Sequence, residues 1–367
     1  ASTAHAYGSM LLALCFPAES GRLAGVQLGL LLQWFFSGVG KIGPWFEYVN
    51  GPFMLQSRWL RGQPWLQRLL VTSEEKMTPT SLAKCLAHLA AAAEYVAPVL
   101  LMIPFVPAIW LGFFTLLAMH LYILLMPAPF DVYSWNLCFG CSNIYLFCSG
   151  HFGFDHQSFL EMNHCLKLYF MAEFVLCCYG NIWPDEVGYY LSHRYWAGNW
   201  VQSFFFVKKT ERVKAKLDAV AKSKGIGNPL SLQQPPYLQY CLGYLSMAYL
   251  WLATFNMKCF ARLFQDMLSL SSSHVDDWQF LKLSGWLCGD FRDELYAKKV
   301  MPAIQEECKF EEGEAYLLRI GAFSWLGIAS WQIFDLSKGA VKEGTMTIQM
   351  MKSIDSLPTQ ALQLMMD

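Results

Sequence analysis

The chain has 367 residues, of which 55% are hydrophobic and 16% aromatic, while only 15% carry charge. Globular domains carry about 25% charged residues, so this composition excludes an ordinary soluble protein and indicates one that lies largely in a membrane. The formal net charge of −1 indicates no nucleic-acid partner, because such binding requires a basic excess.

Apolar stretches long enough to cross a bilayer recur along the chain. A helix needs about 20 mostly apolar residues to span the hydrocarbon core. Six stretches are candidates: 24–40, 85–103, 108–126, 132–147, 166–182 and 237–255. The second and third are separated only by the short turn from Pro104 to Pro107, so they form an antiparallel hairpin. The sequence therefore predicts about six spanning helices.

The segment 195–207 is apolar and aromatic but too short to span. We expect an interfacial helix near 195–207, or a re-entrant one, because Trp and Tyr favour the headgroup level of a membrane. If that segment does not cross, two basic segments, 58–84 and a loop predicted over 208–236, fall on the same face of the membrane. This arrangement satisfies the positive-inside rule.

Acidic residues become frequent in the last part of the chain, 258–367, which indicates a segment that faces water. There, β-favouring residues at 314–331 and 340–350 flank a turn signal at 335–339, a pattern that predicts a small hairpin. We therefore predict an all-α polytopic membrane bundle over 1–257 and a small extramembrane α+β tail at the C-terminus.

Lys41 directly follows the first apolar helix, after the small residues Ser37, Gly38 and Gly40. One interpretation is a snorkelling lysine, whose ammonium group reaches the lipid headgroups while its stem stays buried. The other is a desolvated lysine that is neutral and acts as a base. The sequence leaves both interpretations open.

Glu94 and His120 each lie in the middle of a helix of the predicted hairpin. A carboxylate within a span is costly unless it is paired, so Glu94 is a candidate functional residue. The alternative is a structural contact of Glu94 with His120 or with a tyrosine inside the bundle. Asp131 and Asn136 lie near one end of the fourth predicted span, where such residues act as helix caps.

Cysteine, histidine and acidic residues gather between Cys138 and His164, as they do at metal sites. Cys138 and Cys141 have the CxxC spacing, and Glu161 and His164 have the ExxH spacing found in di-iron helices. A zinc ribbon needs a second CxxC pair, and a di-iron site needs a second ExxH motif; the sequence completes neither pattern. We therefore predict no metal site and interpret 151–164 as a polar loop.

The residues around Lys41, Glu94 and His120 resemble the core of the HTTM superfamily, which includes the vitamin K-dependent gamma-glutamyl carboxylases. The resemblance rests on the small-residue run before Lys41, on the helix that carries Glu94, and on His120 in the next helix. It implies that Lys41 is a base, because the matching lysine of the carboxylases is activated by oxidation of vitamin K hydroquinone. The carboxylases have two lysines in tandem where this chain has Gly40 and Lys41, and their large lumenal domain has no counterpart here.

The chain also resembles an uncharacterised transmembrane family that is common in actinobacteria. The similar segments are 80–98, 129–136, 194–200 and 308–314. Relatives in that family carry further membrane segments before the position of Ala1. We therefore expect an N-terminal portion that is encoded separately, removed or lost.

Two functions from different classes follow from these observations. The first is an accessory or structural subunit of a respiratory or photosynthetic assembly in an organellar energy-converting membrane, with membrane lipids and other proteins as partners and bound lipids or pigments as cofactors. The 14 Trp, 27 Phe and 17 Tyr residues favour it. The second is a membrane enzyme or carrier for a lipophilic substrate such as a quinone, with Lys41 as base and Glu94 and His120 controlling its protonation state.

Overall fold

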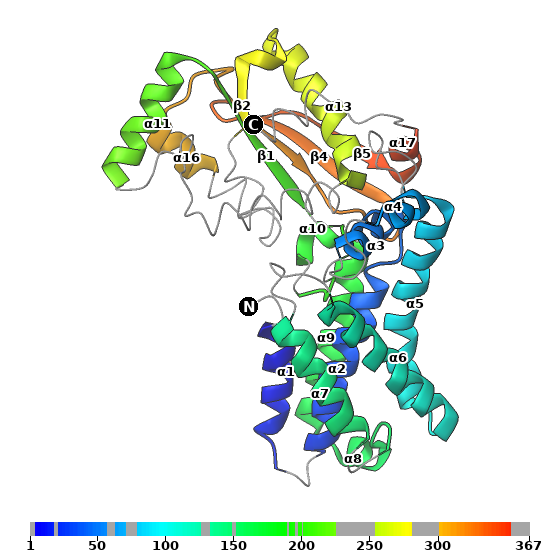
Figure 1. Ribbon diagram of the computed structural model, residues 1–367. Helices are drawn as coiled ribbons and strands as arrows, with labels where there is room; N and C mark the ends of the chain where they lie inside the picture. Colours follow the sequence, from blue (N-terminus) through cyan, green and yellow to red (C-terminus); the bar gives the residue numbers. More distant parts are fainter. Residues whose placement is uncertain are drawn as a thin grey trace. The chain divides into compact units, whose positions relative to one another are not determined.

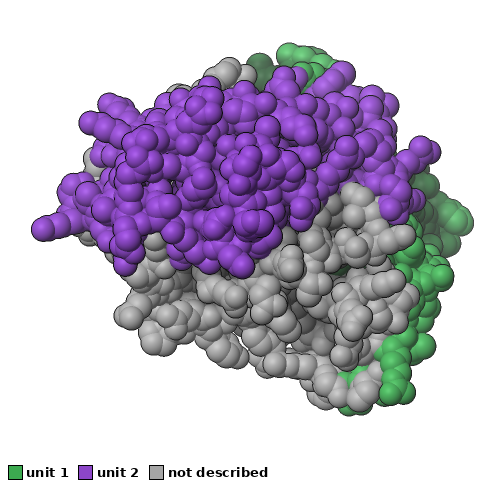
Figure 2. Space-filling view, turned by 90° about the horizontal axis from the view of Figure 1, so that it is seen from above, with its two compact units in different colours: residues 1–181, 189–198 green, residues 182–188, 199–367 purple. Residues whose placement is uncertain are grey.

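The chain divides into two compact units, which Figure 2 shows in different colours. Residues 1–181 and 189–198 form the first unit, and residues 182–188 and 199–367 form the second. The computed structural model describes residues 4–17, 21–56, 63–70, 79–125, 133–148, 152–188, 191–194, 197–199, 201–224, 254–280 and 301–353. This described part is mostly helical and contains one antiparallel sheet (Figure 1).

The first unit is a bundle of helices (Figure 1). Its described helices are α1 (Ala4–Leu14), α2 (Arg22–Val39), α3 (Pro44–Gln56), α4 (Pro64–Leu70), α5 (Ser81–Met102), α6 (Val106–Leu124), α7 (Tyr133–Phe147), α8 (His156–Glu161) and α9 (His164–Ile182). The predicted hairpin of α5 and α6 is confirmed. Thr80 caps α5 by accepting a hydrogen bond from the Ala83 N–H, and Gly112 lets α6 approach the Ala97 carbonyl.

Three of the described helices, α5, α6 and α9, are long and apolar enough to cross a membrane. α2 and the segment Pro44–Asn50 of α3 pass the same test together, although the chain bends by 101° between them. α7, with 15 residues, corresponds to the fourth predicted span. Of the sixth predicted span, only residues 254 and 255 lie within the described part. Large apolar side chains that α5, α6 and α9 expose, such as Leu89, Leu111 and Val175, suit contact with lipid.

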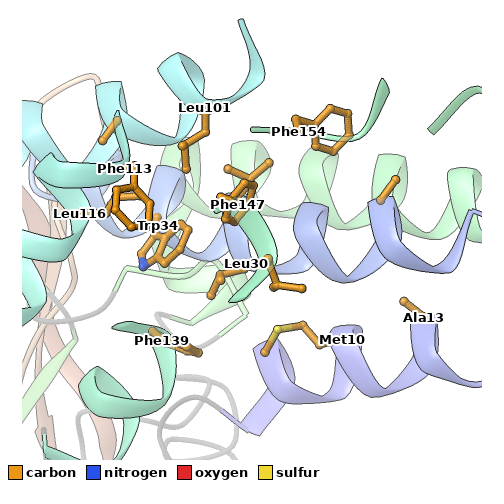
Figure 3. Packing of buried hydrophobic residues seen from close by; sticks show 14 of the residues in the cluster. Met10, Ala13, Leu30, Trp34, Leu101, Phe113, Leu116, Phe139, Phe147 and Phe154 are labelled. Atoms are coloured by element: carbon orange, nitrogen blue, oxygen red, sulfur yellow. The ribbon is translucent and has the colours of Figure 1, made fainter. Parts of the chain in front are cut away.

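α2 lies at the centre of the first unit, where aromatic and aliphatic side chains from several helices meet. Figure 3 shows Leu30 and Trp34 of α2 together with Leu101 of α5, Phe113 of α6 and Phe147 of α7. The Trp34 and Phe147 ring centroids are 6.2 Å apart. This packing places one face of α2 against the α5–α6 hairpin, which is also where the predicted functional residues lie.

The second unit is built on a five-stranded antiparallel sheet with the strand order β2-β1-β3-β4-β5. The strands are β1 (Gln202–Lys208), β2 (Trp278–Phe280), β3 (Ala315–Ile320), β4 (Ile328–Asp335) and β5 (Gly339–Thr347). The other described elements are α10 (Pro184–Val187), α11 (Glu211–Lys224), α13 (Thr254–Ser271), the 3-10 turn η2 (Val275–Asp277), α16 (Met301–Cys308) and α17 (Ile348–Lys352). β4 and β5 meet at the predicted turn, so the C-terminal hairpin is confirmed.

The helix predicted near 195–207 is wrong for residues 202–207, which belong to strand β1. β1 lies between β2 and β3 and is covered on both faces. Phe204 and Phe206 pack on Phe260 of α13, with ring centroids 4.6 and 5.9 Å away, while Phe205 is buried in a separate apolar cluster with residues of α11. A strand buried on both faces has no polar alternation, so its apolar run looks like a short helix. The second unit therefore includes residues well before the boundary that we predicted at 257.

The basic loop predicted over 208–236 is wrong for residues 211–224, which form α11. Val213 and Leu217 are buried on one face of α11, while Lys214 and Lys222 are exposed, so the helix is amphipathic. The buried carboxylate of Glu314 lies 2.7 Å from both Arg212 Nε and Lys216 Nζ. These ion pairs attach α11 to the turn that precedes β3.

The pKa of Glu314 lies below its usual value of 4.5. Burial raises this pKa, but hydrogen bonds from Lys216 and from the Glu311 N–H, together with the charges of Lys216 and Arg212, outweigh burial. A carboxyl group whose pKa is lower in the folded than in the unfolded chain stabilises the fold above the unfolded pKa. This contribution is lost as the pH falls through the folded pKa.

We therefore expect acidification below pH 4.5 to weaken the second unit, and Glu314→Gln to remove this part of the acid dependence. Hydrogen–deuterium exchange of β3 peptides measures this loss of stability when the variant and the unmodified chain are compared at each pH. Glu312→Gln is the control, because Glu312 pairs with Lys338 at an exposed position. An acid dependence that persists unchanged in Glu314→Gln would contradict the expectation.

Candidate functional site

Lys41 lies in the bend between α2 and α3, immediately after the C-terminal end of α2. Trp45 of α3 donates a hydrogen bond from Nε1 to the Gly40 carbonyl at 3.1 Å, which satisfies one of the carbonyls left free where α2 ends. The C-terminus of a helix carries partial negative charge, so a cation at this position is stabilised. The Lys41 side chain is only 9% exposed and turns into the bundle.

Gly38 brings α2 against α5 at the level of Glu94. A Cβ atom at Gly38 would lie 2.5 Å from the backbone nitrogen of Tyr95 and 2.9 Å from the carbonyl carbon of Glu94, so only glycine permits this approach. One turn further along the chain, Lys41 Nζ donates a hydrogen bond to Glu94 Oε2. The same ammonium group lies 5.5 Å from the centroid of the Phe46 ring. The two buried charges therefore compensate each other inside the helical bundle.

His120 is held by hydrogen bonds at both ring nitrogens. Trp34 Nε1 lies 3.0 Å from His120 Nε2, and Asn136 Oδ1 lies 2.8 Å from His120 Nδ1. An indole N–H only donates, so Nε2 must accept and Nδ1 carries the proton that is donated to Asn136. This pair of contacts selects one neutral tautomer of His120. Asn136 is thus a partner of His120 and not a helix cap, and Asp131 lies outside the described residues.

Lys41, Glu94 and His120 line one cavity of about 100 Å³ between α2, α3, α5, α6 and α7. Most of the wall is aromatic or aliphatic, which is typical of small-molecule sites. Two polar atoms on the wall, Gln33 Oε1 and the Tyr122 hydroxyl, are buried and have no hydrogen-bond partner among the described residues. The cavity therefore combines an ion pair, further hydrogen-bonding groups and an apolar wall.

The structure brings the three predicted residues to one cavity. Glu94 pairs with Lys41 and not with His120, and Lys41 does not extend to the surface as a snorkelling lysine would. Gln33 lies four residues before Ser37, so the two share one face of α2, which the sequence spacing could have indicated. Gln33 Nε2 donates to Ser37 Oγ at 2.8 Å, which fixes the orientation of its amide.

The residues considered as metal ligands do not gather in the described part of the chain. No group of three or more His, Cys, Asp or Glu side chains suited to a metal is found there. Cys138 and Cys141 are both exposed on α7, and Asp155 caps α8 by accepting from the Ser158 N–H at 2.9 Å. His151 lies outside the described residues.

The comparisons with known proteins agree with the apolar helices of the first unit. No curated protein and no solved structure matches the chain. A family described as "Transmembrane protein of unknown function (DUF3556)" matches residues 1–361. Together with the three apolar helices that are long enough to span a bilayer, this match supports an integral membrane protein. The chain therefore belongs to the DUF3556 family of transmembrane proteins of unknown function.

Proposed function

We propose that the cavity of the first unit binds the polar ring of a lipophilic small molecule, and that a quinone or its quinol is the class of ligand. The observation that carries this proposal is the Lys41–Glu94 ion pair on the wall of a largely apolar cavity within a helical membrane bundle. Intramembrane charges are costly and mark sites that bind substrates or move protons. The similarity of these residues to the HTTM core, where quinol chemistry occurs, supports the same ligand class.

The ion pair assigns different roles to its two members. The Lys41 ammonium group donates a hydrogen bond to a quinone carbonyl oxygen, and the Glu94 carboxylate accepts one from a quinol hydroxyl. Lys41 becomes a base only after it has passed its proton to Glu94, so Glu94 is the proton acceptor in the resting pair. His120 positions the Trp34 indole through its Nε2 atom and exchanges no proton in this scheme.

The size of the cavity sets a condition on binding. Its volume of about 100 Å³ is smaller than the roughly 150 Å³ of an engineered cavity that holds benzene, so a ring must displace part of the wall. Met119, Ile123 and Trp135 line the cavity and are only partly buried, so they are the wall residues that a bound ring would displace. The unpartnered atoms of Gln33 and Tyr122 then offer hydrogen bonds to ring substituents.

The test measures how tightly a short-chain quinone binds to the full chain in detergent. Quenching of tryptophan fluorescence reports the binding. Lys41→Met removes a charged hydrogen-bond donor worth about 1.5–3 kcal/mol, so we expect affinity to fall by about tenfold to a hundredfold. Lys84→Met is the matched control, because Lys84 on α5 is exposed and lies 3.8 Å from Glu47. Circular dichroism verifies that each variant stays helical. Equal affinity of the Lys41 and Lys84 variants would reject the proposal.

A second proposal, an accessory subunit of a respiratory or photosynthetic membrane assembly, is supported by an aromatic surface on the first unit. The ring of Trp110 on α6 stacks on Phe114 at 5.3 Å between centroids and lies 4.6 Å from Phe152, and all three residues are exposed. Aromatic side chains are enriched at interfaces between proteins. Blue-native electrophoresis of mild-detergent extracts tests this role. Migration as a free monomer without co-purifying proteins would reject it.

A further inference from the structure

A second buried carboxylate lies in the first unit, away from the cavity residues. Glu173 lies midway along α9, one of the helices long enough to cross a membrane, and its side chain is 9% exposed. Its Oε1 atom accepts a hydrogen bond from Ser9 Oγ of α1 at 3.0 Å. Its Oε2 atom is buried and has no hydrogen-bond partner among the described residues. A carboxylate at this depth must be paired or protonated.

His193 contacts the same oxygen of Glu173 that accepts from Ser9. His193 Nε2 lies 3.4 Å from Glu173 Oε1, and the His193 side chain is fully buried. The segment 191–194 that carries it adopts an uncommon backbone conformation, with a φ of 56° at His193. Cys177 of α9 attaches the same segment by donating from Sγ to the Leu191 carbonyl at 3.5 Å. The fold therefore places an imidazole against a carboxylate inside the bundle.

A chain of hydroxyl groups connects Glu173 to the outside of the unit. The Tyr169 hydroxyl lies 2.8 Å from Ser9 Oγ, which in turn donates to Glu173. Tyr169 is 36% exposed, whereas Ser9 is buried, so the chain runs from a partly exposed group to a buried one. Each member carries an exchangeable proton and contacts the next at hydrogen-bond distance.

We infer that Glu173 and His193 form a buried proton-binding couple, loaded through Tyr169 and Ser9. In the loading step Ser9 passes its hydroxyl proton to Glu173 and takes the phenol proton of Tyr169, which takes a proton from a hydronium ion and leaves water. Each broken O–H bond is replaced, and the net change is one proton bound at Glu173. Among the described residues, Cys177 on α9 interacts electrostatically with Glu173, and Arg194, which follows His193 in the chain, packs against Gly40.

A hydrophobic carbodiimide, which reacts with protonated carboxyl groups in apolar surroundings, tests the couple on the unmodified full chain. Peptide mass spectrometry after labelling in detergent is expected to find the label on Glu173. Glu94 is the internal control, because its carboxylate is paired with Lys41 and is expected to label far less. No label on Glu173 at any pH where the chain stays folded would overturn the inference.

The route is tested separately with Ser9→Ala. In this variant we expect the label on Glu173 to reach the same level at equilibrium but the infrared band of the protonated carboxyl group to exchange with deuterium several-fold more slowly. Glu173→Gln, which keeps the shape of the side chain, is expected to abolish that band. An unchanged exchange rate in Ser9→Ala would reject the hydroxyl route, and a band that survives Glu173→Gln would reject Glu173 as the proton site.

Discussion

Replacement of Glu94 with leucine is expected to lower the free energy of unfolding of the first unit by about 3–5 kcal/mol. The variant leaves the Lys41 ammonium group buried without its carboxylate, and an unpaired buried charge is among the largest single destabilising effects in proteins. Thermal unfolding of the full chain in detergent, followed by tryptophan fluorescence, measures the loss.

The double variant Lys41→Met with Glu94→Leu distinguishes two causes of the lost stability, the unpaired charge and the lost packing. We expect it to recover most of the stability, because apolar side chains of similar volume replace a buried ion pair at little or no net cost. Glu47→Leu is the matched control, since Glu47 pairs with Lys84 and His88, which are both about half exposed. A Glu94→Leu chain as stable as the Glu47→Leu chain would show that Lys41 is not buried with Glu94.

Substitution of Gly38 with alanine is expected to disrupt the Lys41–Glu94 pair by separating the two helices, α2 and α5, that carry it. The new Cβ would lie 2.5 Å from the Tyr95 nitrogen, and the atoms that it meets include backbone atoms of α5 that cannot rotate away. Such overpacking costs about 1–3 kcal/mol and moves α2 away from α5. The Lys41–Glu94 hydrogen bond then lengthens, so we expect quinone affinity to fall together with thermal stability.

Gly8→Ala is the control for Gly38→Ala, because both glycines lie in helices of the first unit. No atom lies within 4 Å of a Cβ placed at Gly8. Alanine there is expected to stabilise α1 by up to about 1 kcal/mol, since it favours the helix over the unfolded chain. Equal effects of the two substitutions on thermal unfolding and on quinone binding would refute a close contact of α2 with α5.

Much of the first unit was predictable because a bilayer imposes a simple rule on sequence. The helices α5, α6 and α9 consist of long apolar runs, and Pro104 between α5 and α6, with Pro107 in the first turn of α6, marks the turn of their hairpin. The second unit was less predictable. β1 is buried on both faces, so its run of phenylalanines has no period from which a strand can be distinguished from a short helix.

The sequence by itself determined that the chain lies in a membrane and that Lys41, Glu94 and His120 are polar residues in apolar surroundings. The tertiary structure alone decided their partners. Lys41 and Glu94 lie 53 residues apart in the chain, and His120 lies 86 residues from Trp34. The Lys41–Glu94 pair forms where a residue without a side chain, Gly38, lets α2 pack directly on α5. Hydropathy reports where a side chain is costly, whereas helix packing decides which group compensates that cost.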